Sequence, residues 1–120
     1  AGCTLTVLAG FLRFLPIPQE WEGRVLNIHP SLLPAFGGKG YYGDRVHSAV
    51  LARGVKYTGC TVHYVDNVYD NGPIAVQRAI RVNTNDTVET LAARVFEEEK
   101  IALPEAINMH FALRELEAEA

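Results

Sequence analysis

An unbroken run of apolar and β-branched residues extends from Cys3 to Ala9 and ends at Gly10. A strand with one face in water alternates apolar and polar residues, so an unbroken run is typical of a parallel strand that is covered on both faces. A sheet with both faces covered carries helices on each side. The run therefore predicts an α/β fold in which helices flank a partly parallel sheet.

The rest of the chain contains three more strand-like runs. These further strands are predicted at Arg24–Ile28, Tyr57–Asp66 and Ile74–Val82. The turn Asn71-Gly72-Pro73 joins the last two over a short distance, so we expect them to pair as an antiparallel edge.

Two helices are expected between and after these strands. Asp44 is a candidate N-cap for the first, which Gly54 ends. The second is long and amphipathic, and it begins with Asp86 and Glu89 at capping-box spacing. Pro104 is expected to kink it or to start a second helical segment. The predicted buried stripe of the long helix consists of Val88, Leu91, Ala92, Val95 and Phe96.

Length and composition restrict the function classes. The 120 residues are 48% hydrophobic and 21% charged, which is typical of one globular domain over residues 1–120. A net charge of -3 argues against nonspecific nucleic-acid binding. The sequence has neither a membrane-spanning run nor the basic start of a signal peptide, so we expect a cytoplasmic protein. Cys3 and Cys60 both lie in apolar runs and are interpreted as buried thiols.

Polar residues gather at the ends of two predicted strands. Because strand side chains alternate, Asn27 and His29 share one face, and His63 has a similar place on the next strand. Asp70 follows in the adjoining turn. If the two strands are neighbours, these side chains converge at one edge of the sheet.

An amide, an imidazole and a carboxylate together suit the attack of an amine on a carbonyl. Donors aimed at the developing oxyanion lower the barrier, and the loss of one typically costs ~3 kcal/mol. Other interpretations stay open, since His47 or His63 alone fits a buried core residue and Asp70 alone fits turn chemistry. The histidines lack a recognised zinc spacing, so no metal is expected. The glycine-rich stretch 37–43 does not match a phosphate-binding loop.

Three segments carry a family resemblance: NIHPSLLPAF, GCTVHYVDNVYDNGPIAVQ and DTVETLAARVFEEEKIALPEAI. Together they resemble the C-terminal half of the phosphoribosylglycinamide formyltransferases, which are folate-dependent enzymes of purine synthesis. The resemblance implies the corresponding half of a Rossmann-like sheet. It also implies formyl transfer from 10-formyltetrahydrofolate to the amine of glycinamide ribonucleotide, without a metal.

The resemblance also assigns roles to individual residues. Asn27 and His29 would hold the oxyanion, with His29 as proton donor and Asp70 keeping this histidine charged and oriented. Glu99 would face the ribose of the nucleotide. The residues implied in folate binding are Leu12, Arg13, Phe14, Leu15, Asn27, Val65, Asp66 and Asn67.

The family pattern also contains an N-terminal half with a phosphate-binding loop, which this sequence lacks, so we expect a fragment. Alternatives left open are a methionyl-tRNA or sugar-nucleotide formyltransferase, a deformylating hydrolase, and a catalytically silent folate-binding module. A homodimer is also left open, because no heptad pattern decides the oligomeric state.

Overall fold

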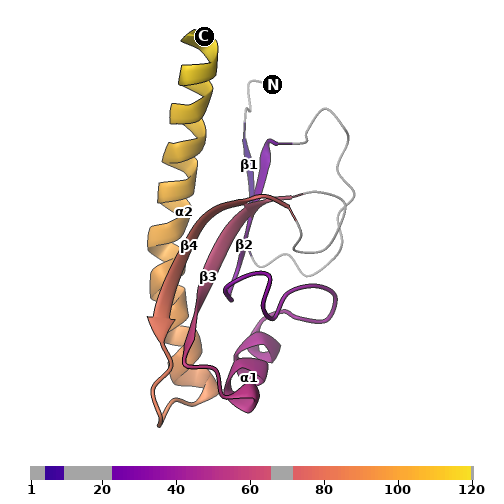
Figure 1. The fold of residues 1–120 in the computed structure, drawn as a ribbon, viewed down its shortest axis with the longest axis vertical. Helices are drawn as coiled ribbons and strands as arrows, with labels where there is room; N and C mark the ends of the chain where they lie inside the picture. Colours follow the sequence, from indigo (N-terminus) through magenta and orange to yellow (C-terminus); the bar gives the residue numbers. More distant parts are fainter. Residues whose placement is uncertain (1–4, 10–22, 66–71, 120) are drawn as a thin grey trace.

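The computed structural model describes residues 5–9, 23–65 and 72–119, which form four strands and two helices (Figure 1). The elements in chain order are β1 (Thr6–Ala9), β2 (Val25–His29), α1 (Asp44–Arg53), β3 (Tyr57–Tyr64), β4 (Ile74–Arg81) and α2 (Val88–Glu119). Every predicted strand and helix that falls in these ranges is present, with boundaries that differ by one or two residues. The Cys3 end of the first predicted strand and the Asp66 end of the third lie outside the described residues.

The four strands form one sheet in the order β1-β2-β3-β4. β1 and β2 are parallel, whereas β3 is antiparallel to both β2 and β4. The α/β class, the parallel strands and the antiparallel edge are therefore confirmed. Because β2 and β3 run in opposite directions, the intervening α1 is not part of a parallel crossover.

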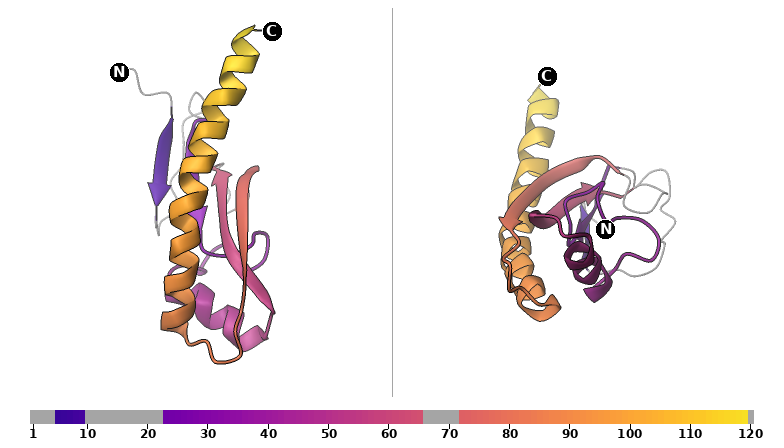
Figure 2. Two further views of the ribbon diagram at one scale, coloured as in Figure 1. Left: turned by 90° about the vertical axis from the view of Figure 1, so that its left-hand side faces the viewer. Right: turned by 60° about the horizontal axis from the view of Figure 1, so that its bottom comes forward.

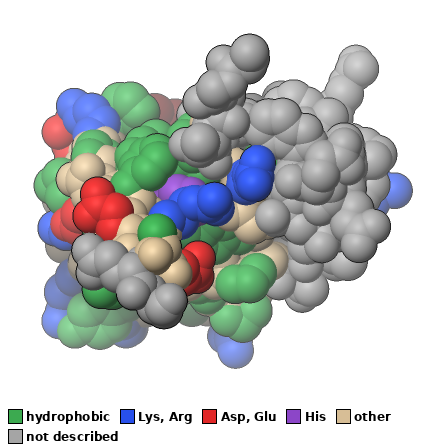
Figure 3. Space-filling model, turned by 90° about the horizontal axis from the view of Figure 1, so that it is seen from above, with side chains coloured by type: hydrophobic (Ala, Val, Ile, Leu, Met, Phe, Trp, Pro, Cys, Tyr) green, Lys and Arg blue, Asp and Glu red, His purple; other side chains and the backbone are tan. Residues whose placement is uncertain are grey.

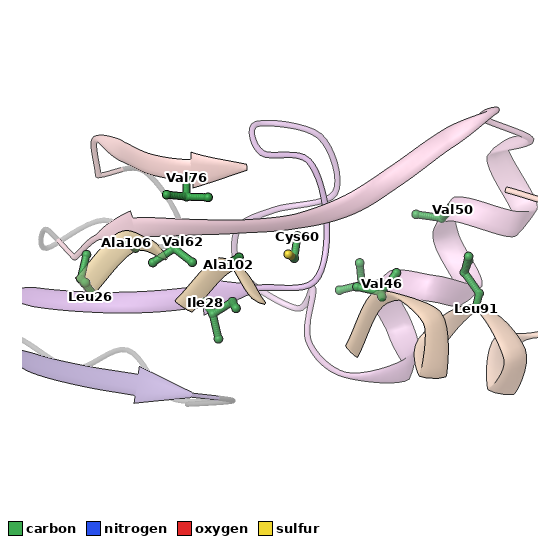
Figure 4. Close-up of a cluster of buried hydrophobic side chains, with 11 residues drawn as sticks. Leu26, Ile28, Val46, Val50, Cys60, Val62, Val76, Leu91, Ala102 and Ala106 are labelled. Carbon is green, nitrogen blue, oxygen red and sulfur yellow. The ribbon is translucent and has the colours of Figure 1, made fainter. Parts of the chain in front are cut away.

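One face of the sheet is covered by α2, which continues past the end of the strands, while α1 lies at the opposite end (Figures 1 and 2). Side chains between the sheet and α2 form the core, and Val46, Val50 and Leu91 extend this core to the contact between α1 and α2 (Figure 4). The sheet side of the core comes from alternate positions of the strands. Its buried members there are Leu26, Ile28, Cys60, Val62 and Val76. We call this surface the α2 face.

The predicted cap residues of both helices are wrong. Gly43 is the N-cap of α1 with a φ of 54°, and Asp44 is instead the first helical residue. For α2, Thr87 and Thr90 form the reciprocal box: the Thr90 N–H donates to Thr87 Oγ1 at 3.2 Å, and the Thr87 N–H donates to Thr90 Oγ1 at 2.9 Å. Asp86 lies one residue before the N-cap position, and its carboxylate accepts a hydrogen bond from the Asn83 N–H at 2.8 Å. The predicted end of α1 at Gly54 is confirmed by its left-handed conformation.

The predicted buried stripe of α2 is corrected, as is the second helical segment, one of the two outcomes expected at Pro104. Phe96 is 56% exposed rather than buried, and Lys100 lies over its ring at 5.4 Å. Leu91 and Val95 are buried as predicted, whereas Val88 and Ala92 are half-buried. The helix continues through Pro104 without a second segment. Pro104 and Lys100 are both exposed, so water can solvate the Lys100 carbonyl that loses its helical partner.

Candidate active site

The polar face of the sheet lies opposite the α2 face and is built by β2 and β3. In their antiparallel register Asn27 pairs with His63, and His29 pairs with Thr61. All four residues therefore point to the same side, as strand alternation requires. His29, Thr61 and His63 are each at most 4% exposed. The predicted convergence of Asn27, His29 and His63 is thus present in the fold.

The Asn27 amide contacts the His63 ring, with 3.5 Å between Asn27 Nδ2 and His63 Nε2. His63 Nδ1 lies 3.2 Å from the Tyr64 carbonyl, which only accepts, so Nδ1 is the donor in this contact. Nε2 then accepts from Asn27 Nδ2, and this contact orients the amide. Asn27 Oδ1 is buried without a hydrogen-bond partner among the described residues. A buried polar atom of this kind is costly unless a ligand satisfies it.

The His29 ring is held by the loop that follows β2. Its Nε2 donates to the Phe36 carbonyl at 2.8 Å, which leaves Nδ1 at the opposite edge of the imidazole. Phe36 adopts a positive φ of 54°, uncommon for a non-glycine residue. The Ser31 hydroxyl donates to the Ala35 carbonyl at 2.6 Å and stabilises this turn. The loop thus sets the orientation of His29.

A hydrogen-bond network centred on Thr61 anchors the same loop to the sheet. Thr61 Oγ1 donates to the Ser31 carbonyl at 2.7 Å and accepts from the Leu33 N–H at 3.0 Å. Gln77 on β4 donates to both Thr61 Oγ1, at 3.1 Å, and the Leu33 carbonyl, at 2.9 Å. The sequence analysis gave no role to Gln77, although its alternation with Val76 along the strand was an available signal.

His47 also belongs to this region. His47 lies on α1 and is 4% exposed. Burial lowers the pKa of its imidazole; the charge of Asp44 acts to raise this pKa, and the nearby His29 acts to lower it. His47 Nδ1 is buried without a hydrogen-bond partner in the described part of the chain. A neutral His47 does not oppose a positive charge on His29. Our sequence analysis treated His47 as a possible core residue, and its helical spacing from Val46 and Val50 gave no sign of this proximity.

Most of the other predicted site residues lie outside the described residues, namely Leu12, Arg13, Phe14, Leu15, Asp66, Asn67 and Asp70. Their roles stay predictions. Val65 is described and half-buried, and its N–H donates to the Val25 carbonyl at 2.8 Å. Val65 therefore lies directly beside β2.

Glu99 is not brought together with Asn27 and His29. It lies half-buried on α2, where burial raises the pKa of its carboxyl group. Its charge also acts on the thiol of Cys60, on the α2 face of the sheet. The predicted contact of Glu99 with a ribose stays a prediction that the polar face does not support.

Two features are absent from the described residues. None of their His, Cys, Asp and Glu side chains form a group of three that could hold a metal ion. Within the same ranges, neither helix combines the length and apolar character needed to cross a bilayer. The predicted absence of a metal stays a prediction for the chain as a whole.

Comparison with known proteins identifies the family. The family model described as formyl transferase matches residues 1–107. The chain belongs to the formyl transferase family. Phosphoribosylglycinamide formyltransferase, chloroplastic, of Vigna unguiculata is 55% identical over 95 residues, which are 78% of this chain and 30% of that protein. The formyltransferase chain thus spans about a third of the length of this curated relative.

Solved structures agree with this family. Phosphoribosylglycinamide formyltransferase from Anaplasma phagocytophilum superposes with a TM-score of 0.77 at 40% identity, over 87% of this chain and 50% of that one. A formyltetrahydrofolate deformylase from Pseudomonas syringae gives a TM-score of 0.81 at 34% identity, over 92% and 36% of the two chains. The predicted family resemblance is confirmed.

Proposed function

We propose that the protein transfers a formyl group from 10-formyltetrahydrofolate to the amine of glycinamide ribonucleotide, a step of purine biosynthesis. The observation that carries the proposal is the shared face of β2 and β3, where an oriented Asn27 amide lies beside the buried His29 and His63 rings. The likeness to a protein named phosphoribosylglycinamide formyltransferase, at 55% identity, supports this choice of substrates.

In the proposed reaction the amine nitrogen attacks the formyl carbon, and the carbonyl π electrons move to oxygen. Asn27 Nδ2 has a second N–H besides the one directed at His63, and we assign it to the oxyanion. The intermediate then collapses, breaking the carbon bond to the folate nitrogen. The attacking amine loses one proton and the leaving nitrogen gains one, so the reaction needs no redox partner.

His29 is the proposed proton donor to the leaving nitrogen. Its Nε2–H is engaged by the Phe36 carbonyl, so the proton that moves is assigned to Nδ1. The neutral state that burial gives His47 removes one source of repulsion for a charged His29. We retain Asp70 as the carboxylate that keeps His29 charged, as the family resemblance implies.

The remaining family-implied roles are part of the same proposal. We assign the pterin pocket to residues 12–15 and the folate-side loop to Val65, Asp66 and Asn67. A cytoplasmic location and a homodimer also remain predictions.

A direct test replaces His29 in the full-length protein. We expect His29→Ala to lower kcat for formyl transfer by roughly two to four orders of magnitude while the Kd for the folate changes only a few-fold. Arg53→Ala, at the exposed end of α1, is the matched control and keeps wild-type turnover. Unchanged kcat in His29→Ala would refute the assigned role.

Hydrolysis of the same folate is a second candidate, favoured by the superposition on a formyltetrahydrofolate deformylase. In that reaction water replaces the amine, and formate is released. Formate production from 10-formyltetrahydrofolate without an amine, measured against formyl transfer with glycinamide ribonucleotide, separates the two. Formate release at the faster rate would replace transfer by hydrolysis as the function.

A further inference from the structure

His29, Thr61 and Gln77 form one row across the polar face. His29 of β2 pairs with Thr61 of β3, and Thr61 pairs in turn with Gln77 of β4. His29 and Thr61 are buried, whereas Gln77 is exposed on β4, the last strand of the sheet in the described residues. An exposed side chain is thus in register with the buried imidazole that we assign to proton transfer.

The Gln77 amide completes the hydrogen bonding of Thr61. Its nitrogen lies 2.9 Å from the Leu33 carbonyl oxygen, which only accepts, so this atom is the NH₂ group and donates. Its second N–H donates to Thr61 Oγ1 at 3.1 Å. Thr61 Oγ1 also accepts from the Leu33 N–H at 3.0 Å, so both of its lone pairs are used. The hydroxyl proton must then go to the Ser31 carbonyl, 2.7 Å away.

These bonds hold the loop after β2, which orients His29. Gln77 and Thr61 together bond both backbone groups of Leu33. Further along the same loop, the Phe36 carbonyl accepts from His29 Nε2 at 2.8 Å. A carbonyl that accepts from one ring nitrogen fixes the histidine tautomer and leaves the other nitrogen for chemistry. The Gln77 amide therefore acts on His29 through the backbone of this loop.

The described surface at the C-terminal end of α2 has no such link to His29. Hydrophobic, cationic and acidic side chains are intermixed over it (Figure 3). Beneath this surface, the Tyr64 hydroxyl lies 2.9 Å from His110 Nδ1 and joins β3 to α2. Tyr64 follows His63 along β3 and therefore points to the opposite side of the sheet from His29. The row on the polar face is the arrangement that reaches the candidate active site.

We propose that Gln77 is a positioning residue for formyl transfer, an inference that rests on the function proposed above. Its amide holds the loop so that the Phe36 carbonyl keeps the His29 Nε2–H engaged and Nδ1 is presented to the leaving nitrogen. Misplacement of a catalytic group by about 1 Å can cost about a hundredfold in rate. Water can solvate the Leu33 carbonyl when the exposed amide is lost, so stability should change little, but water does not hold the loop in one position.

The test measures formyl transfer by the full-length protein with Gln77→Leu, which removes the amide. We expect kcat to fall by roughly tenfold or more, while KM for 10-formyltetrahydrofolate changes by less than about twofold. Gln77→Glu keeps the shape of the side chain but not its N–H donors, so kcat should fall as far. Gln77→Lys restores N–H donors and should recover part of the loss. Arg81→Leu, an exposed change on the same side of β4, is the matched control and keeps wild-type kcat.

A second measurement follows the His29 imidazole directly by ¹⁵N-resolved NMR of the full-length protein. We expect His29 to be protonated on Nε2 in the wild type, and exchange of this proton with water to be roughly threefold faster or more in Gln77→Leu but not in Arg81→Leu. Because this measurement needs no turnover, it separates the two proposals. A wild-type protein without formyl transfer would refute the proposed function, whereas unchanged proton exchange in Gln77→Leu would overturn the role of Gln77.

Two kinetic outcomes would overturn this role as well. One is wild-type kcat in Gln77→Leu or Gln77→Glu in a protein that transfers formyl. The other is a loss of kcat that only follows the loss of folded protein, measured by urea unfolding, without recovery in Gln77→Lys.

Discussion

Replacement of Thr61 by Val should destabilise the protein more than any other near-isosteric change on the polar face. The Thr61 side chain is fully buried, and its hydroxyl makes three hydrogen bonds, to Ser31, Leu33 and Gln77. Val fills the same volume but removes all three. The Ser31 carbonyl and the Leu33 N–H then lose their bond to Thr61 in a region that excludes water.

The size of the effect follows from these contacts. Gln77 keeps its bond to the Leu33 carbonyl at 2.9 Å, so its loss is partial. Two backbone groups are left without this partner, and each costs about 1–3 kcal/mol, so the free energy of unfolding should fall by about 3 kcal/mol. Hydrogen exchange at the Leu33 amide should accelerate as well. The same loop holds His29 through Phe36, so turnover should also fall.

Urea unfolding of the full-length protein and exchange at Leu33 measure the two effects. Thr58→Val is the matched control, because Thr58 is 2% exposed on the same strand and its side chain makes no hydrogen bond to another described residue. This control should change the free energy of unfolding by less than about 1 kcal/mol. Thr61→Ser, which keeps the hydroxyl, should lie between the two. A Thr61→Val protein as stable as the Thr58→Val control would refute the reasoning.

Three further predictions concern Asp86, Cys60 and Gly59. Hydrogen bonds, of which the one from the Asn83 N–H has the largest effect, lower the pKa of Asp86 in the folded state below 3.8. The contribution of Asp86 to stability is therefore complete above pH 3.8 and is lost as the pH falls toward the folded pKa. Asp86→Asn should lower the free energy of unfolding by about 1 kcal/mol at neutral pH. The dependence of this free energy on pH, measured by urea unfolding between about pH 2 and 5, should become weaker, and an unchanged dependence would contradict the prediction. Burial, followed by the charge of Glu99, raises the pKa of Cys60 to about 12, so peptide mapping should find Cys60 unalkylated by iodoacetamide at pH 8 unless the protein unfolds. A Cβ on Gly59 would lie 1.9 Å from the Arg78 carbonyl oxygen of β4. Gly59→Ala should therefore lower the free energy of unfolding by about 3 kcal/mol or more. If the Gly59→Ala protein melts like the wild type, β3 and β4 separate more easily than this close contact suggests.

The polar face could be predicted because it depends on the period of a strand. Alternation alone placed Asn27 and His29 together, and the register of β2 with β3 then brought His63 opposite Asn27. The position of His47 could not be predicted in this way. It depends on how α1 is placed at the end of the sheet, which no local pattern encodes.

The errors in α2 have a similar origin. Thr87 and Thr90 form the box one residue after Asp86, because two threonine hydroxyls satisfy the same backbone groups that Glu89 was expected to serve. Phe96 was assigned to the buried stripe from its spacing, but spacing does not say how wide a stripe the sheet covers. His110 continues the buried positions Ala102 and Ala106 at intervals of four, so its burial was readable from the sequence, although its contact with Tyr64 was not.

The register of β3 decides which of its side chains lie on each face of the sheet. His63 faces Asn27 on the polar face, and Tyr64, the next residue, faces His110 on the α2 face. A shift of β3 by one residue would exchange these side chains between the faces, removing both the candidate active site and the contact between Tyr64 and His110. Gly59 opposes this shift by its close approach to β4, and Thr61 opposes it through its bonds to the loop after β2. Substitutions at Gly59 or Thr61 should therefore lower both the stability of the protein and formyl transfer, whereas His29→Ala should affect formyl transfer alone.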